Sequence, residues 1–139
     1  MYKSESILVN KFVKSLTRED TPFTGLNCAL EFNYNNGKVD IIAVDQMGHV
    51  FSFEAKLRVW KKAFQQAHRN SSFSHYSYVV IPKSQINNVL QHEEIFIKRG
   101  IGLCSIDSNK LEIFIMADRK HSIQPWLTQS AKNYVGLYP

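Results

Sequence analysis

Three residues that can do chemistry together lie on two neighbouring predicted strands. Asp40 interrupts an apolar run, and Glu54 and Lys56 follow two residues apart in the next alternating segment. A carboxylate in a buried strand is costly unless it has a partner. Two carboxylates can hold a hard divalent cation such as Mg²⁺, and an ammonium beside them can orient water or stabilise developing negative charge. The pattern indicates a metal-dependent phosphodiesterase site, and ordinary surface alternation at Glu54 and Lys56 is the alternative.

A hairpin is expected to bring these residues together. Residues 39–44 are almost continuously apolar, as in a central strand covered on both faces. Residues 50–58 alternate between apolar and polar side chains, so Glu54 and Lys56 share one face. A turn at 46–48 joins the two segments, and antiparallel pairing would place Asp40 beside Glu54.

The rest of the pattern predicts helices and strands around this hairpin. Helices are expected over about 4–17, 59–69 and 84–98, and further strands over about 27–34, 76–81, 101–106 and 111–116. We therefore expect an α/β fold with a central mixed β-sheet flanked by helices. Residues 1–118 would form this domain, and 119–139 a C-terminal extension of uncertain structure whose aromatic side chains favour docking.

Composition limits the class of protein. The 139 residues suffice for one domain, and a net charge of +5 slightly favours polyanionic partners. Cys28 and Cys104 lie far apart and are expected to be free thiols of a soluble cytoplasmic protein with no membrane span. The five histidines show no zinc-ligand spacing, and the sequence has no phosphate loop, serine-esterase elbow or dinucleotide fingerprint.

The segment from Gly37 to Asp45, followed by Val50-Phe-Ser-Phe-Glu-Ala-Lys-Leu, resembles the core motif of the PD-(D/E)xK nuclease superfamily. The similarity continues through Trp60-Lys-Lys-Ala-Phe-Gln-Gln-Ala and Tyr78-Val-Val-Ile-Pro, and spans roughly residues 4–116. It implies a restriction endonuclease-like fold with an α-β-β-β-α-β core, as in small bacterial or resolvase-like members. Val39 stands where the family often has proline.

The resemblance assigns roles to individual residues. Asp40 and Glu54 would bind Mg²⁺ or Mn²⁺, the backbone carbonyl of Ala55 would add a ligand, and Lys56 would assist the attacking water. Glu5 matches the position of a glutamate that some resolvase-like members add to the site. It is equally explained as an acidic residue at a helix N-terminus.

Gln66 matches a glutamine that helps arrange the site in several members. Their pattern is Gln-x-x-x-Tyr, but Asn70 stands at the tyrosine position here. The motif is therefore incomplete, and Gln66 is equally explained as a solvated helix residue. Two other acidic residues lie close to the motif in sequence: Asp45 is expected to be a turn residue, and Glu31 to form a cross-strand charge pair.

Four basic residues follow the Glu-x-Lys segment and are candidate phosphate contacts, although a solvated helix face is the default for such a run. They are Arg58, Lys61, Lys62 and Arg69.

The leading hypothesis is a Mg²⁺-dependent nuclease that hydrolyses DNA phosphodiester bonds, with RNA also possible as substrate. The alternative is a non-catalytic nucleic-acid-binding or assembly module that retains the nuclease scaffold. A homodimer is plausible because two related sites can cut both strands of a duplex.

Overall fold

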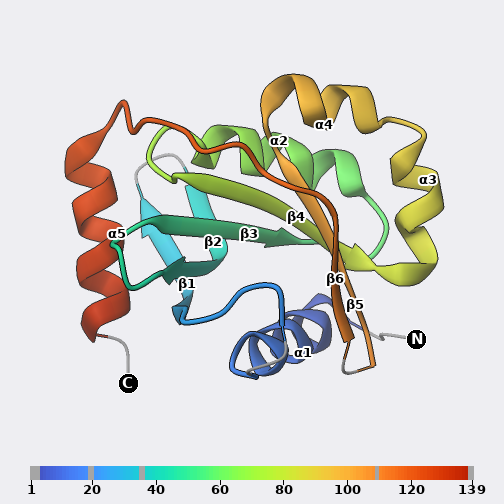
Figure 1. Ribbon diagram of the computed structural model, residues 1–139, viewed down its shortest axis with the longest axis horizontal. Helices are drawn as coiled ribbons and strands as arrows, with labels where there is room; N and C mark the ends of the chain where they lie inside the picture. Colours follow the sequence, from blue (N-terminus) through green and yellow to red (C-terminus); the bar gives the residue numbers. More distant parts are fainter. Residues whose placement is uncertain (1–3, 19–20, 35–36, 109, 138–139) are drawn as a thin grey trace.

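A computed structural model describes residues 4–18, 21–34, 37–108 and 110–137 of the chain. A six-stranded sheet runs through it, with helices on both faces (Figure 1). The strands are β1 (Asn27–Tyr34), β2 (Gly37–Val44), β3 (Val50–Ala55), β4 (Tyr76–Pro82), β5 (Gly102–Asp107) and β6 (Lys110–Ile115). The helices are α1 (Glu5–Leu16), α2 (Trp60–Asn70), the 3₁₀ turn η1 (Lys83–Gln85), α3 (Ile86–Leu90), α4 (Glu93–Arg99) and α5 (Pro125–Leu137).

The strands lie side by side in the order β1-β2-β3-β4-β5-β6. The first three pair antiparallel, β3, β4 and β5 pair parallel, and β6 returns antiparallel to β5. Helix α2 makes the crossover between the parallel strands β3 and β4, as parallel pairing requires. The expected α/β class, mixed sheet and α-β-β-β-α-β order are confirmed.

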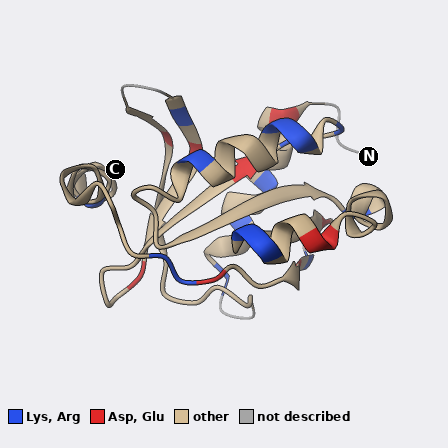
Figure 2. Ribbon diagram, turned by 90° about the horizontal axis from the view of Figure 1, so that it is seen from above, with Lys and Arg blue, Asp and Glu red and all other residues tan. Residues whose placement is uncertain are grey.

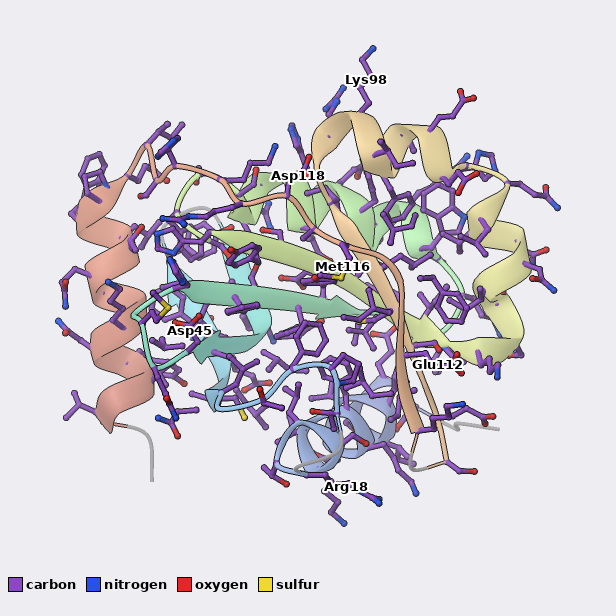
Figure 3. The ribbon with its side chains drawn as sticks, viewed as in Figure 1. Arg18, Asp45, Lys98, Glu112, Met116 and Asp118 are labelled. Atoms are coloured by element: carbon purple, nitrogen blue, oxygen red, sulfur yellow. The ribbon has the colours of Figure 1, made fainter. Side chains whose placement is uncertain are left out.

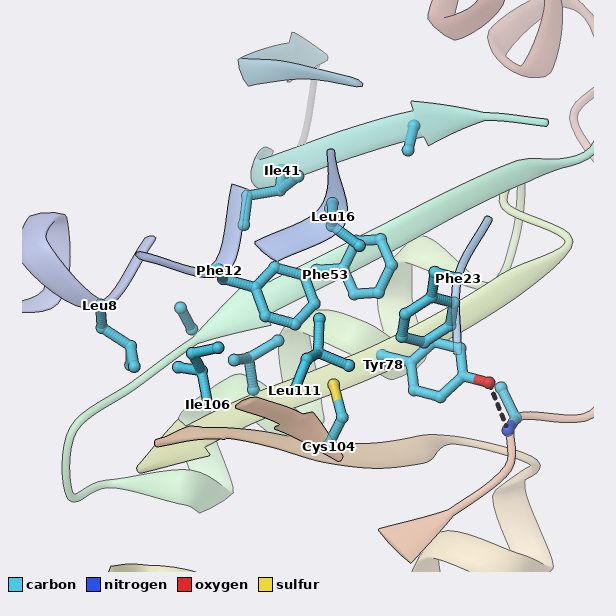
Figure 4. Packing of buried hydrophobic residues seen from close by; sticks show 14 residues of the cluster. Leu8, Phe12, Leu16, Phe23, Ile41, Phe53, Tyr78, Cys104, Ile106 and Leu111 are labelled. Carbon is cyan, nitrogen blue, oxygen red and sulfur yellow. Dashed lines mark hydrogen bonds between the residues drawn. The ribbon is translucent and has the colours of Figure 1, made fainter. Parts of the chain in front are cut away.

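Helix α1 covers one face of the sheet. Its side chains Leu8, Phe12 and Leu16 are buried against the apolar positions of β2, β3 and β4 (Figure 4). The rings of Phe12 and Phe53 have centroids 4.9 Å apart. Because Phe53 alternates with Glu54 along β3, this packing turns Glu54 toward the opposite face.

Two helical groups cover that opposite face. Helices α2, α3 and α4 pack over β4 and β5, and α5 packs over β1 and β2 with Ala131 and Val135 buried. The hydroxyl of Tyr134 on α5 donates to the Leu30 carbonyl of β1 at 2.6 Å. Residues 125–137 therefore dock on the sheet as a helix, and the domain boundary expected after residue 118 stays a prediction.

Two elements differ from the sequence expectation. The strand expected over 50–58 ends at Ala55, and the helix expected over 84–98 is divided into η1, α3 and α4. His92 has φ −115° and ψ 24°, outside the helical region, and Figure 1 shows α3 and α4 running in different directions. Val89 and Phe96 are buried in the same apolar cluster. The hydrophobic periodicity therefore predicted which side chains are buried but not the break between the two helices.

Helix α4 ends at Arg99, as expected from Gly100, whose backbone lies in the left-handed region at φ 69°. The expected turns over 35–37 and 107–109 include residues outside the described part of the chain. None of the described helices is long and apolar enough to cross a membrane.

Gly102 provides a test of the packing between β4 and β5. A Cβ atom at this position would stand 2.2 Å from Cε1 of Tyr78 and 2.9 Å from the Ala117 nitrogen. Because that ring is buried and its hydroxyl accepts from Ala117 N–H at 3.2 Å, it cannot move freely. We expect Gly102→Ala to lower the free energy of unfolding by about 1 to 3 kcal/mol in urea titrations.

Gly136 is the matched control, since nothing lies within 4 Å of a Cβ built there on α5. We expect Gly136→Ala to leave stability unchanged or to raise it by up to about 1 kcal/mol. Equal effects of the two substitutions would contradict this account of the packing.

Candidate active site

Asp40 joins β2 to β3 through its side chain. The register pairs Ile41 with Phe53, and beyond that pair Asp40 Oδ2 accepts a hydrogen bond from the Ala55 N–H at 2.9 Å. Asp40 is partly exposed, whereas Ala55 is buried. One oxygen of Asp40 is therefore fixed against β3, next to Glu54.

The sheet is irregular where Asp40 stands. Val39 and Ile42 belong to the same apolar cluster although strict alternation would place them on opposite faces. On the neighbouring strand, Glu31 has φ 58°, in the left-handed region that a residue with a side chain rarely adopts. Because of this local departure from alternation, the side chains of β2 exchange faces of the sheet near Asp40. Sequence periodicity does not indicate this exchange.

Glu54 is completely buried on the face covered by α2. Its Oε2 accepts a hydrogen bond from Nδ2 of Asn70, the last residue of α2, at 2.7 Å. Its Oε1 is buried and has no hydrogen-bond partner among the described residues. A buried acceptor without a well-formed hydrogen bond is costly, and the Asp40 side chain and backbone amide are the groups close enough to affect the Glu54 carboxyl beside Asn70.

Burial and the charge of Asp40 raise the pKa of Glu54 to about 8, against the opposing effect of the hydrogen bond from Asn70. Burial is the larger cause, because it removes the solvation of the charged form. A buried carboxyl with a raised pKa that lies beside a second carboxylate on the neighbouring strand is typical of functional sites. A cation between them would stabilise the ionised form of Glu54 and so offset both effects.

The partners of Glu54 continue outward to the surface. Asn70 Oδ1 accepts from the Tyr34 hydroxyl at 2.7 Å, and this hydroxyl accepts from Arg69 Nε at 3.1 Å. The sequence expectation missed Asn70 and Tyr34 as members of the site. A buried asparagine at a helix end is a detectable signal only when the helix face is known, and Tyr34 comes from another strand.

Lys56 lies just beyond β3, and its Nζ is 3.4 Å from Glu5 Oε1 at the start of α1. Both side chains are partly exposed, at 24% for Lys56 and 46% for Glu5. The structure thus brings Glu5 to Lys56, although α1 and Glu54 lie on opposite faces of the sheet. Ser4 accepts from the Ile7 N–H at 3.3 Å and begins the helix, so Glu5 also lies in its first turn.

Gln66 lies one turn before Asn70 on α2 and is partly buried. Its Oε1 is buried and has no hydrogen-bond partner among the described residues. Residues four apart on a helix share a face, so Gln66 and Asn70 present side-chain amides on the same side of α2. Gln66 is therefore not a fully solvated residue.

The four basic candidates do not gather on one surface. Arg58 lines a groove of about 780 Å³ together with Glu5 and Lys11, whereas Lys61 lines a second groove between α2 and α4. Arg69 lines a third, between β1 and α5, and Lys62 is exposed on α2. Figure 2 shows Lys and Arg distributed over several elements. Arg58 is the one that shares a groove with Glu5 near Lys56.

Two acidic residues take the roles expected of them outside the site. Asp45 lies at the turn before β3, at the opposite end of that strand from Lys56 (Figure 3). Burial alone would raise the pKa of Asp45. Hydrogen bonds from the backbone amide and the ring of His49, and from the backbone amide of Met47, outweigh it and hold the pKa of Asp45 below its usual value. Glu31 pairs with Lys38 of β2 at 3.6 Å.

The carboxyl groups of Asp40 and Glu54 are the side chains of the site that could hold a cation. Among the residues that the structure describes, no group of three or more His, Cys, Asp or Glu side chains is arranged to hold a metal ion. Mg²⁺ needs only one or two carboxylates, because water and substrate phosphate supply its other ligands. Asp40 and the unpartnered Oε1 of Glu54 fit this requirement.

Comparison with solved structures shows a shared fold. The SPO1766 protein of unknown function from Silicibacter pomeroyi superposes with a TM-score of 0.63 at 17% identity, covering 99% of this chain and 93% of that one. SfsA of Pyrococcus furiosus, solved with Ca²⁺, gives a TM-score of 0.37 at 9% identity over 82% of this chain and 61% of that one. The second likeness is too weak to carry an argument. No protein-family model and no curated protein matches the chain.

The buried carboxyl gives a test in the metal-free protein. The pKa of Glu54 is about 8 in the folded chain against an ordinary value of 4.5 for glutamate, so the folded state holds the proton more tightly. Glu54 therefore lowers stability as pH rises from about 4.5 to 8. We expect Glu54→Gln to raise the free energy of unfolding by about 3 to 5 kcal/mol at pH 8 and little at pH 5, measured in urea with chelator present.

The control is Glu31→Gln, because Glu31 is 69% exposed in its side chain and makes only a surface ion pair. Its effect should stay below about 1 kcal/mol at both pH values. A Glu54→Gln protein that is no more stable than wild type at pH 8 would show that the carboxyl is solvated and not strained.

Proposed function

We propose that this protein is a metal-dependent nuclease of the PD-(D/E)xK type that hydrolyses DNA phosphodiester bonds. The observation that carries the proposal is the buried Glu54 carboxyl, whose pKa the nearby charge of Asp40 raises and whose Oε1 lacks a well-formed hydrogen bond among the described residues. Two adjacent carboxyl groups are costly in a buried site when both are ionised, and a divalent cation between them would offset that cost.

Asp40 and Glu54 would hold the Mg²⁺ or Mn²⁺, with the Ala55 carbonyl as a further ligand. Such an ion, when bound, neutralises charge on the scissile phosphate and lowers the pKa of a bound water. The hydrogen bond from Ala55 N–H keeps Asp40 Oδ2 against β3, which leaves its other oxygen for the cation. Asn70 fixes Glu54 in the same way through Oε2.

Lys56 would orient the attacking water and stabilise negative charge on the phosphate. Its ammonium is 3.4 Å from Glu5, so Glu5 restricts the position of this flexible side chain at the exposed edge of the site. Lys56 follows Ala55 directly and is joined to β4 by the bond from its N–H to Val80 at 3.1 Å. The backbone from which the ammonium extends is therefore rigid.

The groove beside Lys56 is a candidate path for the phosphate backbone. It lies between α1 and the segments that follow β3 and β4, and carries Lys11 and Arg58. The net charge of +5 favours a polyanion by long-range attraction. RNA offers the same phosphates, and the geometry described does not select between the two sugars.

The proposal is tested with supercoiled, single-stranded and branched DNA in Mg²⁺ and in Mn²⁺. We expect wild type to cut at least one substrate only when the cation is present. We expect Lys56→Gln to cut at least about 10²-fold more slowly, because a group that acts on the reacting phosphate and water is lost. Lys14→Gln, which removes an exposed cation of α1, is the control. Gel assays of initial rate give the comparison.

Cation binding separates a nuclease from a scaffold without catalysis. Wild type and Lys56→Gln should both gain thermal stability in Mg²⁺ or Mn²⁺, and Asp40→Asn should lose that gain. Intact DNA in every assay, with no cation-dependent stabilisation of wild type, would contradict the nuclease and favour the alternative of a nucleic-acid-binding module.

A further inference from the structure

Four side chains form a continuous hydrogen-bonded chain from the surface to the buried carboxyl. Arg69 Nε donates to the Tyr34 hydroxyl at 3.1 Å, which donates to Asn70 Oδ1 at 2.7 Å. Asn70 Nδ2 then donates to Glu54 Oε2 at 2.7 Å. Arg69 is exposed, whereas Asn70 and Glu54 are fully buried.

The direction of every bond in this chain is set by chemistry. A guanidinium only donates, and Glu54 only accepts when it is ionised, as it would be with a cation bound, so in that state the phenol and the amide between them each accept on one side and donate on the other. All donors therefore point toward Glu54, and each bond polarises the next. The arrangement fixes which oxygen of Glu54 is occupied and leaves Oε1 as the oxygen without a partner among the described residues.

We propose that Tyr34, Asn70 and Arg69 are positioning residues that hold the Glu54 carboxyl so that Oε1 is available to a divalent cation. This inference rests on the proposed function and deepens it. Partners that orient a metal ligand in this way commonly change metal affinity by about 10- to 100-fold when they are removed.

Arg69 has a second contact that keeps it at the outer end of this chain. A Cβ atom at Gly37, the first residue of β2, would lie 2.5 Å from Arg69 Nη2 and 2.8 Å from its Cζ. The guanidinium thus lies against backbone that has no side chain in its way. This placement holds Arg69 at the outer end of the chain, and its expected role as a phosphate contact stays a prediction.

A purely structural role is distinguishable from a positioning role. The centroid of the Tyr34 ring lies 5.0 Å from that of Phe73, and this packing is a structural contribution of Tyr34. If packing were the only role of these side chains, substitution would change stability and leave cation affinity intact. Tyr34→Phe keeps the ring and removes only the hydroxyl, so it tests the chain directly.

The experiment is a titration of the full chain with Mn²⁺, followed by electron paramagnetic resonance of the free ion. We expect Tyr34→Phe to weaken Mn²⁺ binding about 10-fold, and Arg69→Gln and Gly37→Ala to weaken it by several-fold. Lys14→Gln should bind as wild type does. The sign for Arg69→Gln is decisive, because removing a nearby positive charge would by Coulomb's law alone strengthen cation binding.

A second readout needs no metal. The side-chain amide signal of Asn70 in nitrogen–proton spectra of the metal-free protein should move in Tyr34→Phe and in Arg69→Gln, and stay in Lys14→Gln. Folding of each variant is checked by urea unfolding.

Wild-type affinity in folded Tyr34→Phe and Arg69→Gln, or tighter binding in Arg69→Gln, would overturn the positioning role while leaving the metal site intact. A wild-type chain that binds no Mn²⁺ would instead overturn the proposed function, and the positioning role with it.

Discussion

The burial of one carboxyl group beside another is the constraint on which the rest of this site depends. Glu54 has no exposed surface, and the charge of Asp40 adds to the cost that burial imposes on its ionised form. Asn70 donates to Oε2, whereas Oε1 has no well-formed hydrogen bond among the described part of the molecule and lies under the influence of Asp40. This imbalance lowers stability when Glu54 is ionised, and under the proposed function a bound cation would offset it.

The order of the strands makes this constraint possible. Antiparallel pairing of β2 with β3 brings Asp40 to the Ala55 amide, and the α2 crossover from β3 to β4 returns Asn70 over Glu54. Helix α1, on the other face, delivers Glu5 to Lys56 at the end of β3. Strand β2 and helices α1 and α2 therefore meet around the short segment from Glu54 to Lys56.

Sequence reasoning reached the parts of this arrangement that depend on local pattern. The alternation from Phe51 to Ala55 predicted which side chains of β3 share a face, and the structure buries them in that way. It did not find Tyr34 or Asn70, because their contact joins residues 36 positions apart and depends on the rotation of α2 over the sheet. Nor could periodicity show the left-handed backbone of Glu31 opposite Asp40, or the bend at His92. Such features are set by tertiary packing.

Crystals of the protein soaked in Mn²⁺ would test the central claim most directly, by locating the ion from its anomalous scattering. The account predicts a peak within about 2.0 to 2.5 Å of carboxyl oxygens from both Asp40 and Glu54, with Glu54 Oε2 still held by Asn70. A saturating soak that leaves no ion between these two carboxyl groups would contradict it.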